Sequence, residues 1–181
     1  MTTQKKAASR GVSKLAQTHK DLIEQIDRLN DILINLRYEG KTKVGKNLKE
    51  VWDILAFFEN EVDVHVGVEE KCLFPFLSIH VPRLEPLITL FHSEHEDFRK
   101  NLREFRLAME NLCGEKSESN KPALNDKVRE VGTYLIYLLR QHLAAEGESL
   151  YKAAEHELHE GEKRELDEII EKFNGVKDSC C

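Results

Sequence analysis

The feature that most constrains the fold of this 181-residue chain is a spacing of apolar residues in alternating steps of three and four. That spacing lines up apolar side chains on one face of an α-helix. It recurs in four long stretches, at residues 12–36, 48–73, 84–112 and 128–150. Short connections between such helices favour antiparallel neighbours. The sequence therefore predicts an all-α, up-down-up-down four-helix bundle.

Glycine and proline mark the expected ends of these helices. We expect the first helix to stop near Tyr38, with a turn over Glu39-Gly40 and Gly45, and the second to start near Lys46 and to be limited by Pro75. A charged amphipathic stretch around residues 166–170 predicts a short fifth helix at the C-terminal end. The expected organisation is one bundle domain over residues 12–158, followed over 159–181 by that short helix and a frayed tail.

Composition excludes several classes of function. A net charge of −6 and a pI near 5.8 offer no broad positive surface for nucleic acid. No run of 18 apolar residues could span a membrane, and the start MTTQKKAASR lacks the apolar core of a secretory signal, so we expect a cytoplasmic protein. Cys72 and Cys113 are isolated and Cys180-Cys181 form a terminal pair, so no disulfide framework is expected.

One histidine interrupts each apolar stretch at a position where a large apolar residue is expected: His19, His65, His95 and His142. Each lies about 18 or 19 residues from the turn that joins its helix to the antiparallel neighbour, and at about 1.5 Å of rise per residue the two pairs are level. We therefore expect four imidazoles in one layer of the core. Their ring nitrogens would lack partners there, at a cost of about 1 to 3 kcal/mol each, unless something binds them.

Two glutamates, Glu69 and Glu146, follow His65 and His142 by four residues, one helical turn further on the same inward face. Burying ionised carboxylates among neutral imidazoles is costly unless cations lie between them. The set divides naturally into two sites bridged by carboxylates. Mixed imidazole and carboxylate ligands suit iron, with zinc and manganese as competitors. A bundle without metal is the alternative reading.

Other histidines compete less well for the site. His92 precedes His95 by three residues, but Phe91 already occupies that turn of the apolar face, so we expect His95 to be the ligand. Three more histidines lie in a connection or among charged residues and are expected at the surface: His80, His156 and His159.

These residues resemble the hemerythrin-like, or HHE, cation-binding family. The similarity lies at His19, at HVGVEEKCLFP (65–75), at SEHEDF (93–98) and at HLAAEGESLY (142–151). The resemblance implies a four-helix bundle with a non-haem diiron centre, two iron ions bridged by oxo and carboxylate groups. The implied ligands are four histidines and two glutamates: His19, His65, Glu69, His95, His142 and Glu146.

Two positions depart from the oxygen-carrying members of that family. Arg99 stands where the carriers have a further histidine, and Gly147 stands where they have a bridging aspartate. We therefore expect open coordination positions, no built-in asymmetry between the irons, and no reversible oxygen carriage. The ligand pattern is most similar to the repair of iron centres type. Glu61 and Glu94 match carboxylates near the diiron centre of that type, although a solvated helix face is the alternative reading for both.

The expected function is that of a diiron protein that binds or reduces small oxidants such as O₂, NO or peroxide during oxidative or nitrosative stress. Each iron could keep an open position for such a ligand. The alternative is a non-catalytic sensor of oxygen, NO or iron, or an iron-handling module. No membrane or nucleic-acid partner is expected, and the sequence names no protein partner.

Overall fold

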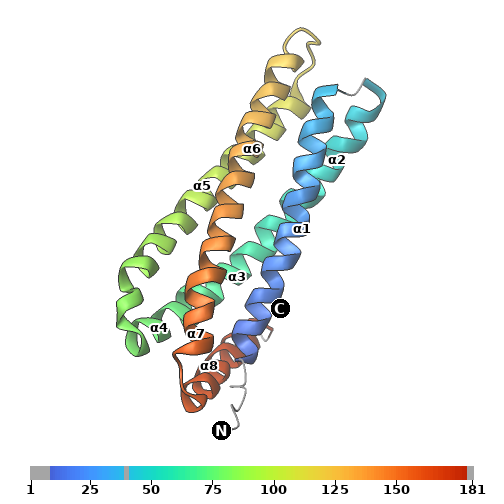
Figure 1. Ribbon diagram of the computed structural model, residues 1–181. Coiled ribbons are helices and arrows are strands. Elements are labelled where there is room, and N and C mark those ends of the chain that lie inside the picture. The colour runs from blue at the N-terminus through green and yellow to red at the C-terminus, as the bar shows by residue number, and fades with distance from the viewer. Residues whose placement is uncertain (1–8, 39–40, 179–181) are drawn as a thin grey trace.

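The computed structural model describes residues 9–38 and 41–178, and within these ranges it contains helices and no strand (Figure 1). The first two arms of the bundle are α1 (Arg10–Tyr38) and a segmented helix made of α2 (Lys41–Phe57), η1 (Phe58–Val62), α3 (Asp63–Val68), η2 (Glu69–Leu73) and α4 (Phe74–His80). The turn η3 (Pro82–Leu84) leads to the other two arms, α5 (Glu85–Gly114) and α6 (Lys121–Glu146) with its continuation through η4 (Gly147–Tyr151) and α7 (Lys152–His156). Last comes α8 (Glu160–Asp178). The predicted all-α bundle with a short C-terminal helix is confirmed.

The second arm differs from its predicted bounds at both ends. It begins at Lys41, so Gly45 lies inside α2, because a single glycine costs a helix only about 1 kcal/mol. It also continues past Pro75 to His80, because the π-helical turn η2 ends at Leu73 and Pro75 falls in the first turn of α4. A proline is tolerated there, since the first N–H groups of a helix have no partner within the helix. The predicted turn at Glu39-Gly40 lies outside the described residues.

The buried apolar residues form two clusters at opposite ends of the bundle. One lies toward the α1–α2 and α5–α6 connections and includes Leu22, Phe58, Phe98 and Leu139. The other lies toward α4, α7 and α8 and includes Leu15, Leu73, Phe91 and Leu150. Every arm contributes to both clusters, and the predicted histidines and glutamates fall between them. The bundle therefore has a polar layer enclosed by two apolar plugs.

Helix α8 crosses the end of the bundle where α1 begins (Figure 1) and packs on α1 and η2. Asp167 of α8 accepts hydrogen bonds from the backbone N–H of Arg10 (3.1 Å) and of Gly11 (2.8 Å), and from the hydroxyl of Ser9 (2.5 Å). These donors belong to the open N-terminus of α1, so Asp167 caps that helix from outside it. The proposed boundary between residues 158 and 159 stays a prediction, and Cys180 and Cys181 lie outside the described residues.

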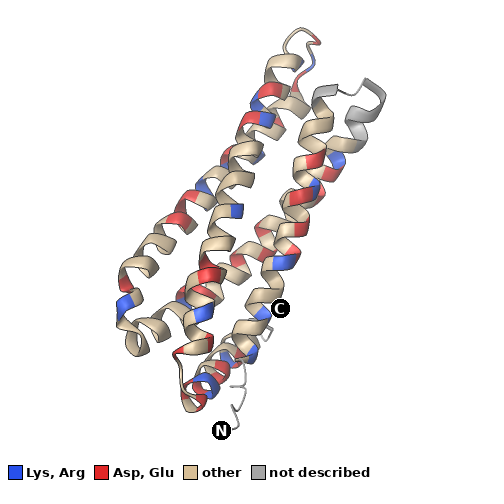
Figure 2. Ribbon diagram, in the orientation of Figure 1, with Lys and Arg blue, Asp and Glu red and all other residues tan. Residues whose placement is uncertain are grey.

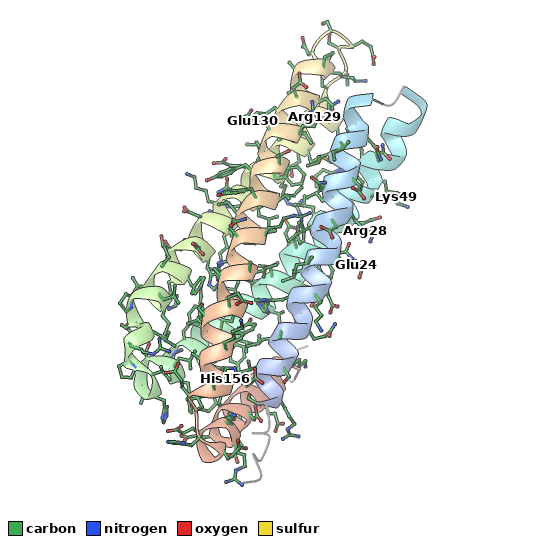
Figure 3. All side chains as sticks on the ribbon, viewed as in Figure 1. Glu24, Arg28, Lys49, Arg129, Glu130 and His156 are labelled. Atoms are coloured by element: carbon green, nitrogen blue, oxygen red, sulfur yellow. The ribbon has the colours of Figure 1, made fainter. Side chains whose placement is uncertain are left out.

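Lys, Arg, Asp and Glu residues are spread along the helices (Figure 2). Figure 3 shows Glu24 and Arg28 on the outer side of α1 and His156 at the end of α7, and all three are exposed. Among the described residues, no helix combines the length and the apolar character that crossing a membrane requires.

Candidate metal centre

The polar layer takes one histidine from each arm of the bundle: His19 from α1, His65 from α3, His95 from α5 and His142 from α6. Glu69 is the first residue of η2 and Glu146 is the last residue of α6. The first three histidines are at most 6% exposed, His142 is nearly buried, and both glutamates are 0% exposed. The structure thus brings together all six residues that the sequence pattern selected for metal binding.

The six residues form two groups that share both glutamates. The first half-site contains His19 and His65, whose Nε2 atoms lie 3.0 Å apart, together with Glu69 and Glu146. The second half-site contains His95 and His142, whose Nε2 atoms lie 3.1 Å apart, and the same glutamates. Within each group the candidate ligand atoms all lie within 4.8 Å of one another.

The two glutamates are oriented to serve both half-sites. In Glu69, Oε1 lies 3.1 Å from Nε2 of His65, whereas Oε2 lies 3.5 Å from Nε2 of His95. In Glu146, Oε2 lies 3.4 Å from Nε2 of His19 and 3.3 Å from Nε2 of His142. Each carboxylate is therefore placed to bridge two cations.

The unsatisfied polar atoms of this layer test whether metal ions fit it. Oε2 of Glu69 and both carboxylate oxygens of Glu146 are buried and have no hydrogen-bond partner. A buried carboxylate in this condition costs several kcal/mol unless a cation neutralises it. Two cations, one in each half-site, would satisfy these oxygens, so the donor set fits a pair of metal ions.

The arrangement of the imidazole pairs also fits metal ions. In the second half-site, Nδ1 of His95 lies 2.9 Å from Glu70 and Nδ1 of His142 lies 2.8 Å from Glu94, so in the neutral rings the protons are on Nδ1. Both Nε2 lone pairs then face each other across 3.1 Å, which is unfavourable without a cation between them. Ligands at right angles around an ion, with bonds of about 2.1 Å, lie about 3 Å apart.

Without metal, protons bound to the histidines partly neutralise the buried carboxylates. Burial lowers the pKa of His142, but the close contact with Glu146 and its charge, together with the hydrogen bond to Glu94, outweigh it and raise that pKa to about 9. Burial and the neighbouring His142 lower the pKa of His95, against the opposing pull of Glu69 and Glu146, because two facing Nε2 atoms can share only one proton. Although burial opposes it, contact with His142 and His19 holds the pKa of Glu146 well below its usual range.

Carboxylates outside the layer orient the histidines of the second half-site. Glu70 contacts His95, and Arg99 of α5 holds Glu70 in turn through two hydrogen bonds of 3.3 Å. Burial raises the pKa of Glu70, but the hydrogen bonds with Arg99 and His95 outweigh burial. The net result is a lowered pKa, so the carboxylate stays ionised. Arg99 thus anchors the residue that positions His95.

The first half-site has different surroundings. Nδ1 of His65 is buried without a hydrogen-bond partner. The hydroxyl of Tyr151, a 6% exposed residue at the end of η4, lies 2.9 Å from Nε2 of His19 and 2.5 Å from Oε1 of Glu69. The expectation of two alike half-sites is therefore wrong for the groups around the ligands.

The remaining candidates lie outside the layer. His92 is half-exposed, 3.9 Å from Glu70 and edge-on to Phe74. Glu94 contacts His142 on the side away from the layer, so its place is that of a positioning residue. Glu61 is exposed and lines a separate cavity that also borders His65.

Sequence reasoning missed two residues that touch the layer, Glu70 and Tyr151. Glu70 could have been noticed, because it follows Glu69 directly and turns toward the neighbouring helix. Tyr151 closes the family-like segment HLAAEGESLY, but helical spacing did not select it, because five α-helical residues separate it from Glu146 by about 140° around the axis. In the π-helical turn η4, residues five apart are hydrogen-bonded and come onto the same face.

A cavity of about 200 Å³ leads from the surface to the layer. Asp97, Tyr137 and Gln141 line it at the exposed end, and three of the four site histidines line its inner end: His65, His95 and His142. Its other walls are largely apolar, with Leu22, Val62, Phe98 and Leu143 among them. Small uncharged molecules could reach the centre by this route.

Comparison with known families agrees with this geometry. The family model described as the hemerythrin HHE cation binding domain matches residues 10–124 of the chain. The matched range holds His19, His65, Glu69 and His95, and the remaining two candidate ligands lie beyond it in α6. No curated protein matches the chain.

Proposed function

The chain belongs to the hemerythrin HHE cation-binding family, and we propose that it holds two iron ions in the layer between its two apolar clusters. The observation that carries this proposal is the pair of fully buried glutamates, each facing histidines of both half-sites, with three oxygens that have no other partner. The proposed ligands are His19, His65, Glu69, His95, His142 and Glu146. Zinc and manganese suit the same donors less specifically.

We further propose that the centre binds or reduces small oxidants such as O₂, NO or peroxide in oxidative or nitrosative stress. Two bound irons would supply electrons and open coordination positions for such ligands. The chain itself supplies a largely apolar cavity that ends at His65, His95 and His142 and favours small uncharged molecules. The apolar clusters on either side keep bulk water away from the ligands. The likeness to the repair of iron centres type stays a prediction.

Elemental analysis of protein from iron-replete cells tests the metal content. We expect about two irons per chain and a strong loss in Glu69→Gln, which keeps the shape of the side chain and removes the bridging charge. Glu130→Gln, an exposed glutamate on α6, is the matched control and should retain full iron content. One zinc per chain, or no metal in the wild type, would contradict the proposal.

The response to oxidants tests the proposed role. Anaerobically reduced protein should be oxidised by peroxide and should react with NO, and both reactions should follow the iron content of the variants. After exposure to oxygen, purging with argon should leave the centre oxidised, since Arg99 and Gly147 replace residues of the oxygen carriers. Full recovery of the reduced spectrum over several cycles would instead identify a carrier. Binding without net oxidation would favour the sensing or iron-handling alternative.

A further inference from the structure

Tyr151 lies at the first half-site with its hydroxyl directed at the metal-binding atoms. The hydroxyl oxygen is 2.5 Å from Oε1 of Glu69, 2.9 Å from Nε2 of His19 and 3.5 Å from Nε2 of His65. The Tyr151 ring lies beside that of His19, with centroids 4.8 Å apart, and the residue is 6% exposed. The phenol is therefore held in place by its neighbours and by the turn η4.

These separations match those among the proposed ligands themselves. Nε2 of His19 lies 3.0 Å from Nε2 of His65 and 3.4 Å from Oε2 of Glu146, and Nε2 of His65 lies 3.1 Å from Oε1 of Glu69. The hydroxyl oxygen thus belongs to the same small group of atoms. An oxygen that only supported a ligand from outside would contact the far side of the ring, as Glu70 and Glu94 do at Nδ1 of His95 and His142.

We propose that the oxygen of Tyr151 is itself a ligand of the ion in the first half-site, bound as a phenolate. The inference rests on the proposed metal centre and adds a fifth protein ligand to His19, His65, Glu69 and Glu146. Among the described residues, the two groups of candidate metal ligands share both glutamates, and the second half-site has no comparable phenol. The two ions would then differ in ligand set as well as in surroundings.

Binding of this kind is a proton exchange without electron transfer. The O–H bond of Tyr151 breaks, the bond from oxygen to the metal forms, and the proton passes to solvent, as for other ligands that must be deprotonated. Without an ion, the same hydroxyl donates its proton in a hydrogen bond to Oε1 of Glu69. The competing role for Tyr151 is to keep that hydrogen bond in the metal-bound protein.

Optical and resonance Raman spectra of the iron-loaded, oxidised full-length chain distinguish these roles. A phenolate bound to ferric iron gives a visible charge-transfer band, and excitation in that band enhances the ring vibrations of the tyrosine. We expect both signals in the wild type and their complete loss in Tyr151→Phe. The matched control is Tyr134→Phe, which removes a hydroxyl from an exposed tyrosine of α6 and should leave both signals unchanged.

Each outcome separates this inference from the proposed function. A wild type with two irons and no phenolate vibrations, or a Tyr151→Phe variant with an unchanged spectrum, would overturn the ligand role and leave the diiron centre standing. A wild type that takes up no iron would overturn both. If Tyr151→Phe fails to fold, wild-type protein made with ring-deuterated tyrosine replaces it: enhanced bands that shift with the label support the ligand, and bands that do not shift refute it.

Discussion

The two half-sites use the same kinds of ligand but are supported in different ways. His95 and His142 each present Nδ1 to a carboxylate outside the layer, at 2.9 and 2.8 Å. In the first half-site, Nδ1 of His65 has no hydrogen-bond partner, and the added group is the phenol of Tyr151. The second half-site is thus supported by carboxylates on the far side of its histidines, and the first half-site gains an additional group on the side that faces the metal.

This difference teaches that one bundle layer can hold two unequal ions. A carboxylate on the far nitrogen fixes the orientation of a histidine and makes it a better donor, and losing such a partner typically weakens metal binding about 10- to 100-fold. We therefore expect the two ions to be bound with unequal affinity: the outer carboxylates strengthen the second half-site, and the proposed phenolate of Tyr151 strengthens the first.

Removing the metal in stages should expose the inequality directly. Binding to the folded state alone adds about 4 kcal/mol at a thousandfold excess over Kd, which for a chain of this size raises Tm by roughly 8 to 16 °C. Titration with a chelator, followed by calorimetry, should show two successive decreases in Tm as one half-site and then the other empties. A single step in which both ions are lost together would show that the two half-sites have equal affinity. Equal Tm for apo and holo protein would show that no metal binds in the core.

Substitution of a single histidine should remove one ion and leave the other. In His95→Ala the second half-site loses a buried ligand, so iron should fall from about two per chain to one or less. His92→Ala is the matched control on the same helix, because His92 is half-exposed and outside the layer, and it should keep its iron. Equal loss in the two variants, measured by elemental analysis, would mean that the wrong face of α5 has been assigned to the centre.

The outer carboxylates should have a smaller and one-sided effect. Glu70→Gln and Glu94→Gln keep a hydrogen bond acceptor but remove the charge, so each should weaken the ion of the second half-site about 10-fold or more and spare the first. Glu96→Gln, which changes an exposed residue of α5, is the control. Competition titrations against a chelator measure both affinities. An equal loss of affinity at the two half-sites would show that the outer carboxylates do not distinguish them.

The sequence was sufficient for the layer itself because the layer depends on helical periodicity. Four apolar stretches fixed the arms, and a histidine that replaces an apolar residue stands out at His19 or His95 as clearly as a charge would. The level of each pair followed from counting residues to the nearest turn, which needs only the rise of a helix. Nothing in this reasoning depended on side-chain detail.

What escaped prediction depends on departures from that periodicity and on contacts between distant segments. The π-helical turn η4 brings Tyr151 onto the face of Glu146, and no residue type announces such a turn. A proline that ends most helices falls at the start of a new segment after η2. The cap of α1 by Asp167 joins residues 156 or more positions apart, a pairing that spacing along the chain cannot indicate.

That cap leads to the smallest expected effect and to another difference between the half-sites, because α1 carries His19 of the first half-site and α8 packs on α1 and η2. Burial raises the pKa of Asp167, but hydrogen bonds from Ser9, Gly11 and Arg10 outweigh it and hold the pKa below the ordinary value of 3.8. A carboxyl whose pKa is lower in the folded state stabilises the fold above its unfolded pKa and loses that effect as pH falls through the folded value.

Asp167→Asn should therefore cost about 1 to 2 kcal/mol at pH 7, since the amide removes the charge and one of the two acceptor oxygens that cap α1. The difference in Tm from the wild type should shrink on acidification from pH 5 to pH 3, because the pKa of Asp167 is lowered in the folded state and the stabilising effect of its charge is lost as pH falls. Glu168→Gln, the exposed neighbour on α8, controls for loss of charge and should melt like the wild type at both pH values. Chelator titration at pH 7 should show that Asp167→Asn lowers the affinity for the ion beside His19 more than the affinity for the ion beside His95. An equal loss of affinity at both positions would mean that α8 stabilises the whole layer through η2 rather than the first half-site through α1.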